Sequence, residues 1–308
     1  MIRYPEPSSP PQALLAQRDR DAGALLVSLV QLTKPGVTRM VLATTWCGAA
    51  IAPGPIAGTG YGKLASVLLG TTLIVASANA LNMYLEGDVD ALMTRTRTRP
   101  IPSGRIAPEV ALWFGLALAF VGLPVLAFLV NPLTAFIGAL SLASYVLVYT
   151  PLKRVSPLAV WVGAFPGAAP PLMGFTGMTG TVTGPALSLF LLLLVWQIPH
   201  FHAIAIFRAG EYRRAGLRVL PVARGLEYTK FSIVAVLILQ LFVSALPAFA
   251  GLGGRPYIAV ATVLGAIYVG WGLAGLRPRA GARWARSLFF ASMPYLLALF
   301  VTLVMGAG

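Results

Sequence analysis

The sequence predicts an all-α integral membrane protein with nine transmembrane helices. Hydrophobic residues make up 57% of the 308 residues, charged residues make up only 10%, and the mean hydropathy is +0.81. A soluble domain carries about 25% charged residues, so charge is too sparse here to cover a soluble surface. The basic residues gather in short clusters between long apolar runs, which is typical of a multi-pass membrane protein.

Nine apolar runs are long enough to cross a bilayer, which takes about 20 residues each. The predicted spans are 37–53, 62–84, 109–130, 132–150, 157–176, 184–206, 231–251, 256–276 and 285–306. Only Asn131-Pro132 connects the third span to the fourth, which predicts a tight antiparallel hairpin. Residues 1–23 are polar and Pro-rich, and residues 1–30 are predicted to form a disordered cytoplasmic tail. Residues 31–308 then form a single transmembrane domain.

The basic residues predict the orientation of the chain. Of the 23 Lys and Arg residues, 21 lie in the N-terminal segment up to Arg39 or in the connections after spans two, four, six and eight up to Arg286. Only Lys63 and Arg255 fall on the other side. The positive-inside rule therefore predicts a cytoplasmic N-terminus and an outside C-terminus. The long connections after spans two and six enter from the same side. We therefore expect two four-helix halves, plus a ninth helix, around a central site that opens to the cytoplasm.

Composition also argues against other classes of protein. The net charge of +14 comes from clusters that obey membrane topology rather than from a basic stripe on a soluble domain, so nucleic acid is not an expected partner. The single cysteine, Cys47, lies inside an apolar run and cannot form an intramolecular disulfide. We interpret it as a small buried apolar residue.

An acidic cluster marks the cytoplasmic end of the second span. Glu86, Asp88 and Asp90 are three of only nine acidic residues in the chain, and carboxylates at membrane depth are costly and usually functional. On a continuous helix Asn82, Glu86 and Asp90 share one face, whereas Asp88 points away unless Gly87 lets it swing in. A Mg²⁺ ion would relieve the repulsion between these carboxylates. The alternative is a solvated charged loop with no ligand.

Arginines follow this cluster at Arg95, Arg97 and Arg99. Guanidinium groups suit phosphate oxygens. Carboxylates, a divalent cation and arginines together indicate a site for a diphosphate substrate. A transporter of lipids or phosphate compounds is the alternative from another class, but it should carry lone charges in the middle of its spans.

The second long connection begins near both histidines of the chain, His200 and His202. Trp196 and Phe201 flank His200, and Arg208 and Glu211 follow. Each histidine could simply bond a backbone carbonyl at the interface. His200, which follows Pro199 at a polar break in the span, could instead act in the site. Glu211 could complete a metal site, or could form an ion pair with Arg208 or Arg214.

These motifs resemble those of the UbiA-type intramembrane aromatic prenyltransferases, and within them the branch that farnesylates haem. The resemblance runs from about Leu32 to the C-terminus. Four separated segments carry it: Leu32-Thr-Lys34-Pro35, then Asn82-x-Tyr84-x-Glu86-x-Asp88-x-Asp90 with Arg95 and Arg99, then Tyr149-Thr-Pro-Leu-Lys153-Arg154, and Trp196-Gln-Ile-Pro-His200-Phe with Glu211-Tyr-x-x-Ala-Gly216. Two departures stand out. Glu86 replaces the more usual Asp, and His200 with Glu211 replaces an Asp-rich second motif, which fits the haem branch.

The resemblance implies that the farnesyl group of farnesyl diphosphate is transferred to a vinyl group of haem b, with Mg²⁺, in a bacterial plasma membrane. Haem A synthase or terminal oxidase assembly factors are further expected partners. A quinone or chlorophyll precursor is the alternative acceptor. The expected catalytic residues are Asn82, Glu86, Asp88, Asp90, His200 and Glu211, of which Glu86, Asp90 and Glu211 are the metal ligands. The expected substrate-binding residues are Lys34, Tyr84, Arg95, Arg99, Tyr149, Lys153, Arg154, Trp196, Phe201 and Arg208.

Two roles are open for His200. It could be an axial ligand of the haem iron, with Lys153, Arg154 or Arg208 contacting the propionates. It could instead orient the diphosphate or a catalytic water.

Overall fold

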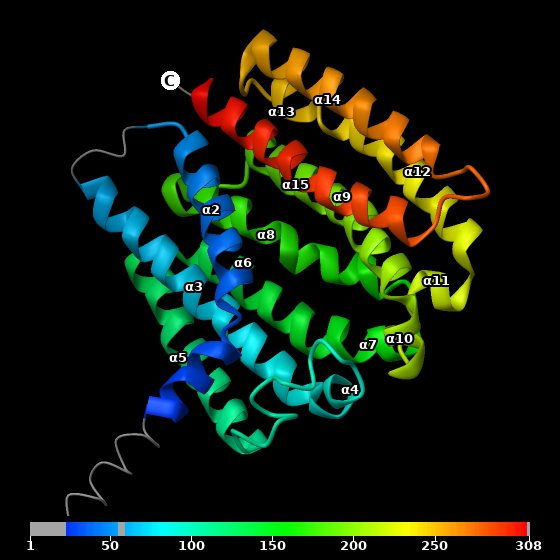
Figure 1. Ribbon diagram of the computed structural model, residues 1–308. Helices are drawn as coiled ribbons and strands as arrows, with labels where there is room; N and C mark the ends of the chain where they lie inside the picture. Colours follow the sequence, from blue (N-terminus) through cyan, green and yellow to red (C-terminus); the bar gives the residue numbers. More distant parts are fainter. Residues whose placement is uncertain (1–22, 55–58, 307–308) are drawn as a thin grey trace, which may run out of the picture.

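The computed structural model describes residues 23–54 and 59–306, and every regular element within these ranges is helical (Figure 1). The long helices are α2 (Pro35–Ile51), α3 (Thr59–Leu85), α5 (Pro108–Leu129), α6 (Pro132–Ala143), α8 (Ala159–Thr179), α9 (Gly184–Phe207), α12 (Leu226–Val243), α14 (Gly254–Ala274) and α15 (Ala282–Met305). Shorter helices are α4 (Gly87–Ala91), α7 (Thr150–Val155), α10 (Ala209–Arg214), α11 (Leu220–Ala223) and α13 (Leu246–Phe249). A π-helix, η1 (Ser144–Tyr149), continues α6 into α7.

Helices occupy each of the nine predicted spans, and two of these spans, 132–150 and 231–251, contain more than one helical segment. Among the residues that the structure describes, seven helices are long and apolar enough to cross a membrane. An eighth span arises if Gly23–Leu32 and α2, which meet at a bend of 50°, are taken together. The helix α8, which contains three prolines, is not among them. The all-α membrane class is therefore confirmed, and the count of nine spans stays a prediction.

Two boundaries differ from those expected. Residues 1–22 lie outside the described residues, but Gly23–Leu32 is helical, so this part of the chain does not belong to the predicted disordered tail. The helix α12 begins at Leu226, before the apolar run at 231, and its first turn holds Glu227. Lys230 is fully buried there and donates to Glu227 at 2.8 Å. This intrahelical ion pair lets a charged turn continue the helix.

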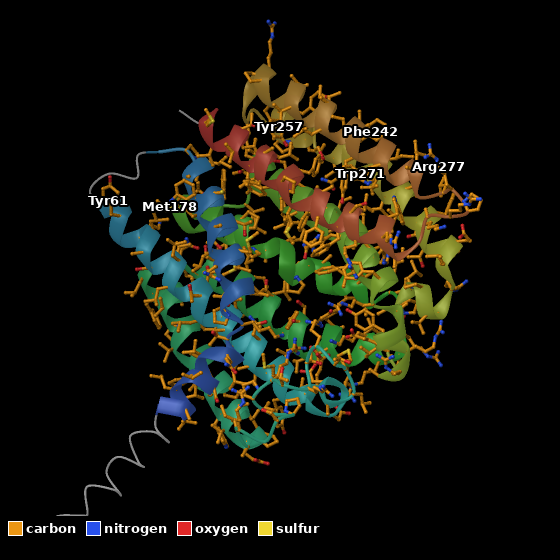
Figure 2. The ribbon with its side chains drawn as sticks, viewed as in Figure 1. Tyr61, Met178, Phe242, Tyr257, Trp271 and Arg277 are labelled. Atoms are coloured by element: carbon orange, nitrogen blue, oxygen red, sulfur yellow. The ribbon has the colours of Figure 1, made fainter. Side chains whose placement is uncertain are left out.

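The short helices α4, α7, α10 and α11 all lie at one end of the bundle, and the C-terminus lies at the other (Figure 1). Tyr61 and Met178 mark the end where the C-terminus lies, whereas Arg277 belongs to the end with the short helices (Figure 2). Between the ends the outer surface is apolar, as the exposed side chains of Phe242 and Trp271 illustrate. Such a surface suits contact with lipid.

The helices α2 and α8 pack closely because glycines line their contact. A Cβ added to Gly48 would collide with the carbonyl of Pro171 on α8, and one added to Gly174 would collide with the carbonyl of Thr45 on α2. Small residues permit this backbone approach in membrane helices. The contact fixes α2, and with it the Lys34 that precedes it, against the helix that forms one wall of the site.

Candidate active site

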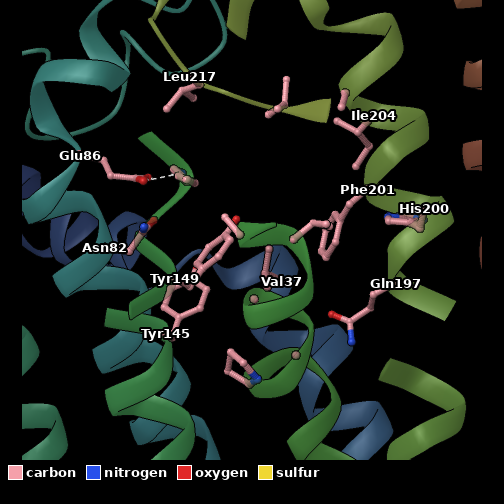
Figure 3. A pocket seen from close by; sticks show the side chains of 18 of the residues that line it. Val37, Asn82, Glu86, Tyr145, Tyr149, Gln197, His200, Phe201, Ile204 and Leu217 are labelled. Atoms are coloured by element: carbon pink, nitrogen blue, oxygen red, sulfur yellow. Dashed lines mark ion pairs between the residues drawn. The ribbon is translucent and has the colours of Figure 1, made fainter. Parts of the chain in front are cut away.

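A cavity of about 1130 Å³ lies at the end of the bundle that carries the short helices. Asn82 and Glu86 face it from the end of α3, and His200 and Phe201 face it from α9 (Figure 3). Tyr145 and Tyr149 of η1 lie between these two walls. The cavity therefore lies between the first and second halves of the chain.

The acidic face forms as expected. Asn82, Glu86 and Asp90 line the cavity and are 2%, 2% and 1% exposed. The helix α3 ends at Leu85, yet the Glu86 amide donates to the Asn82 carbonyl and the Asp90 amide donates to the Glu86 carbonyl, at 3.0 and 2.8 Å. These bonds preserve the helical spacing across the break, so the three side chains keep a common face.

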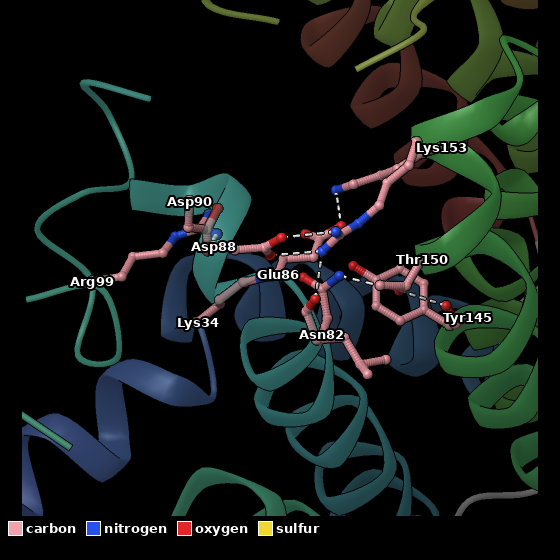
Figure 4. A network of polar contacts seen from close by, with 11 residues as sticks. Lys34, Asn82, Glu86, Asp88, Asp90, Arg99, Tyr145, Thr150 and Lys153 are labelled. Carbon is pink, nitrogen blue, oxygen red and sulfur yellow. Dashed lines mark hydrogen bonds and ion pairs between the residues drawn. The ribbon is translucent and has the colours of Figure 1, made fainter. Parts of the chain in front are cut away.

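Each buried carboxylate has a basic partner (Figure 4). Lys153, on α7, forms an ion pair with Glu86. Arg99 donates from Nη1 to Oδ2 of Asp90 at 2.6 Å. A buried charge is tolerated only when it is paired and hydrogen-bonded. The two pairs therefore explain how both carboxylates stay buried, and they place two cations next to the carboxylates.

The amide of Asn82 is held on both sides. Lys34 Nζ donates to its Oδ1 at 2.9 Å, and its Nδ2 donates to Thr150 Oγ1 at 3.2 Å. Lys34 is the one non-glycine residue with a positive φ, 49°, in the described part of the chain. Such backbone conformations cost energy and concentrate at functional sites. The strained turn before Pro35 directs the ammonium group of Lys34 at the acidic face.

Asp88 lies apart from this face. Its side chain is 66% exposed and accepts two bonds from Arg154 at 2.7 and 2.8 Å. The bond from Arg154 lowers the pKa of the Asp88 carboxyl below its usual value. Arg154 also donates to the Leu85 carbonyl at 2.7 Å. Asp88 and Arg154 thus brace the end of α3 outside the cavity, as an ideal helix predicts for Asp88.

An aromatic wall comes from η1. The rings of Tyr145 and Tyr149 lie 5.2 Å apart at 32°, and both residues line the cavity. Gly163 on α8 makes room for them, because a Cβ there would lie 2.6 Å from two carbons of the Tyr149 ring. Sequence reasoning named Tyr149 and missed Tyr145. The four-residue spacing of the two tyrosines on a helix was the available signal.

The opposite wall positions His200. Its Nδ1 lies 2.7 Å from Ser292 Oγ on α15, and the Ser292 hydroxyl donates to the Phe289 carbonyl at 2.6 Å. The single hydroxyl proton is committed to that carbonyl, so Ser292 Oγ accepts from Nδ1–H of His200. This assigns the neutral tautomer whose Nε2 carries a lone pair. Trp196 stacks on the imidazole at 4.7 Å and donates to the Ser292 carbonyl.

The predicted metal residue Glu211 is not in the cavity lining. Its Oε1 accepts from Arg208 at 2.7 Å, and the ion pair that sequence analysis considered as an alternative therefore forms. Predicted residues that line the cavity are Lys34, Asn82, Glu86, Asp90, Arg95, Arg99, Tyr149, Lys153, His200, Phe201 and Arg208. Predicted residues outside the lining are Tyr84, Asp88, Arg154, Trp196 and Glu211. The substrate, catalytic and metal roles of all these residues stay predictions.

The donor set fits a magnesium ion that is bound together with a phosphate ligand. Within residues 23–54 and 59–306, no three His, Cys, Asp or Glu side chains converge on one point. Glu86 and Asp90 nevertheless present two carboxylates to one cavity. Mg²⁺ is commonly held by one or two carboxylates plus water and substrate phosphates, rather than by an all-protein cage.

Comparison with known proteins is consistent with this geometry. The model of the UbiA prenyltransferase family matches residues 41–293. A protoheme IX farnesyltransferase of Sorangium cellulosum is 52% identical over 245 residues, which cover 80% of this chain and 88% of that protein. A protoheme IX farnesyltransferase of Myxococcus xanthus is 46% identical over 277 residues, which cover 90% of this chain and 93% of that protein.

Solved structures share the fold. A structure of digeranylgeranylglyceryl phosphate synthase superposes with a TM-score of 0.76 at 17% identity and covers 92% of this chain and 98% of that one. A UbiA homologue from Archaeoglobus fulgidus, bound to DMAPP and Mg²⁺, superposes with a TM-score of 0.66 at 16% identity and covers 90% of this chain and 99% of that one.

Proposed function

Because this chain belongs to the UbiA prenyltransferase family, and because a cavity in its bundle joins a buried acidic face to a histidine wall, we propose that it transfers the farnesyl group of farnesyl diphosphate to a vinyl group of haem b. The relatives named above, which carry the name protoheme IX farnesyltransferase at 46–52% identity, support this choice of substrates. The main observation that supports the proposal is that Glu86, Asp90 and His200 line one cavity.

The acidic face would hold the diphosphate through Mg²⁺. Glu86 and Asp90 are the proposed ligands, and the Archaeoglobus fulgidus homologue that binds DMAPP and Mg²⁺ shares the fold. When bound, the ion supplies positive charge that stabilises the departing diphosphate. Lys153, Arg99 and Lys34 already lie at the same face, so their cationic groups can turn from the side-chain oxygens of Glu86, Asp90 and Asn82 to phosphate oxygens. Glu211 would act through Arg208 rather than as a ligand.

The tyrosine wall would shelter the allylic cation. Ionisation of the carbon–oxygen bond leaves positive charge on the farnesyl C1, and the π faces of Tyr145 and Tyr149 can stabilise it. The cavity lining is mostly apolar beyond the charged face, which limits attack by water before the acceptor arrives. The vinyl carbon of haem then attacks C1. Water adds to the resulting cation and releases a proton, which gives the hydroxyethyl group of haem O.

His200 is the proposed axial ligand of the haem iron. The bond to Ser292 leaves its Nε2 with a lone pair, and neutral imidazole is a common haem ligand. A single axial bond would fix the haem disc against α9, with its vinyl groups free to approach the prenyl carbon. Productive transfer needs the two reacting carbons within about 3–3.5 Å.

The chain is a multi-pass membrane protein, and we propose that it lies in a bacterial plasma membrane with the cavity open to the cytoplasm. The clustering of basic residues at the connections of that end supports this orientation. Farnesyl diphosphate and haem b would then enter from the cytoplasmic face, and haem A synthase or a terminal oxidase assembly factor would receive the product.

Product analysis tests the proposed function. In the presence of Mg²⁺, membranes that contain the protein should convert haem b and farnesyl diphosphate into a haem whose mass has grown by one farnesyl group and one hydroxyl group. Chelation of Mg²⁺ should abolish the product and fresh Mg²⁺ should restore it. Prenylation of a quinone precursor with no haem product would refute the assignment of the acceptor.

A further inference from the structure

Two arginines at the far wall of the cavity are not explained by the diphosphate site. Arg208 ends α9 and Arg286 lies at the start of α15, and both line the cavity. Their guanidinium carbons lie 5.8 and 5.6 Å from the ring centre of the same residue, Phe207. The acidic face and its cations lie on α3, α7 and the connections, so this is a second positive centre in the same cavity.

The charges of this centre are only partly neutralised by the protein. Arg286 is exposed and has no ion pair among the residues that the structure describes. Arg208 is paired with Glu211, which leaves part of its five-donor fork available. The two arginines line the cavity and only one of them has a carboxylate partner, so donors remain unused. Arginine recognises carboxylates in bidentate fashion.

The centre is linked to His200 by a chain of aromatic rings. Phe207 meets Phe289 edge to face at 5.7 Å, and Phe289 lies 4.6 Å from the imidazole of His200. Arg208 follows His200 by eight residues on or just after α9, a rise of about 12 Å along the helix. The wall thus offers a metal ligand, then an apolar surface, then two cations.

We propose that Arg208 and Arg286 bind the two propionate carboxylates of the acceptor and thereby select the edge of the haem that enters the cavity. The inference rests on the proposed function. Haem carries both carboxylates on one edge and its vinyl groups on the opposite side. With the carboxylates at the mouth beside Arg286, the vinyl groups point inward, towards Tyr145 and Tyr149. The same contacts disfavour acceptors that lack a pair of carboxylates, because the arginines would then lose water without gaining a partner.

The test compares haem b with its dimethyl ester, in which both carboxylates are blocked. Haem binding is followed by absorption titration and farnesyl transfer is followed by product formation, in the full-length protein. The variant is Arg286→Gln. The matched control is Arg283→Gln, which removes an exposed arginine of the same helical turn that does not line the cavity. Arg286→Lys keeps the charge and removes the planar fork.

A charge-assisted hydrogen bond predicts that Arg286→Gln weakens binding of haem b roughly ten- to a hundredfold. The KM for farnesyl diphosphate should stay unchanged. The wild-type protein should bind the ester more weakly than the variant binds haem b, because the ester loses both carboxylate contacts and the variant loses one. On the ester, the wild-type protein and Arg286→Gln should bind about equally. Arg286→Lys should retain part of the affinity, and Arg283→Gln should behave as the wild type.

Three results would overturn the proposal. Equal losses for haem b and for the ester in Arg286→Gln would mean that the arginine only supports the fold. A raised KM for farnesyl diphosphate would assign Arg286 to the diphosphate site. A wild-type protein that binds the ester as well as haem b would remove the carboxylate subsite altogether. Selective binding of haem b without any farnesylated product would instead support the subsite and refute the proposed function.

Discussion

The ion pair of Glu86 and Lys153 allows the stability of the protein to be separated from its chemistry. Glu86 is buried and Lys153 keeps 21% of its side chain exposed. Removing one member of a buried pair costs about 3–5 kcal/mol because the other charge is left uncompensated. The partial exposure of Lys153 places Glu86→Gln near the lower end, at about 3 kcal/mol. Lys153→Met leaves a carboxylate in the interior and should cost more.

The double variant Glu86→Gln/Lys153→Met removes both charges, so most of the lost free energy of unfolding should return. Its activity should not return. If Glu86 holds Mg²⁺, its loss removes several kcal/mol of transition-state stabilisation, a fall in kcat/KM on the order of 10³-fold. Glu109→Gln is the control, since Glu109 is exposed in the first turn of α5.

The assay pairs unfolding in detergent with farnesyl transfer at several Mg²⁺ concentrations. Glu86→Gln should be both unstable and inactive, and the double variant should be stable and inactive. Recovery of turnover together with stability in the double variant would refute the reasoning, because Glu86 would then serve only to neutralise Lys153. Wild-type turnover of Glu86→Gln at limiting Mg²⁺ would refute the metal role in the same way.

Three further outcomes follow from the structure. Ser292→Ala frees Nδ1 of His200, so the absorption spectrum of bound haem should shift while the unfolding temperature changes little; an unchanged spectrum would argue against ligation by His200. Gly163→Ala places a Cβ 2.6 Å from the Tyr149 ring and should lower kcat at least tenfold. The control Gly62→Ala has no atom within 4 Å of its new Cβ and should have no effect. Equal activities of the two variants would contradict the role of the tyrosine wall. A reporter that works only outside the cytoplasm should be active when it is fused to the C-terminus, and a reporter that works only in the cytoplasm should be inactive there. The reverse pattern would refute the predicted topology.

The sequence predicted those features that depend on local spacing. Apolar runs located the helices because a bilayer demands about 20 apolar residues for each span. The spacing of Asn82, Glu86 and Asp90 predicted their common face, and the structure confirms that all three line one cavity. The same periodicity directed Asp88 away from it, and Asp88 is indeed outside the cavity lining.

Features that depend on contacts between distant segments could not be predicted in this way. Ser292 lies 92 residues from His200, and nothing near either residue indicates their bond. Arg286 belongs to the last helix and carries no motif, so only the packing of α15 against α9 brings it to the cavity. Tyr84 was expected among the substrate-binding residues, but it packs against Leu32 and its neighbours because α3 turns that side of the helix away.

The π-helix η1 has a consequence for the register of the wall that it forms. A π-turn holds one more residue than an α-turn, and each residue in a helix turns the chain by about 100°. The six residues Ser144–Tyr149 therefore act as a built-in insertion that rotates everything after them. Lys153, which forms its ion pair with Glu86, follows this insertion and shares the rotation. Deletion of one residue within η1 could restore a regular α-helix and keep every side chain of the site. Lys153 would then be directed away from the Glu86 carboxylate.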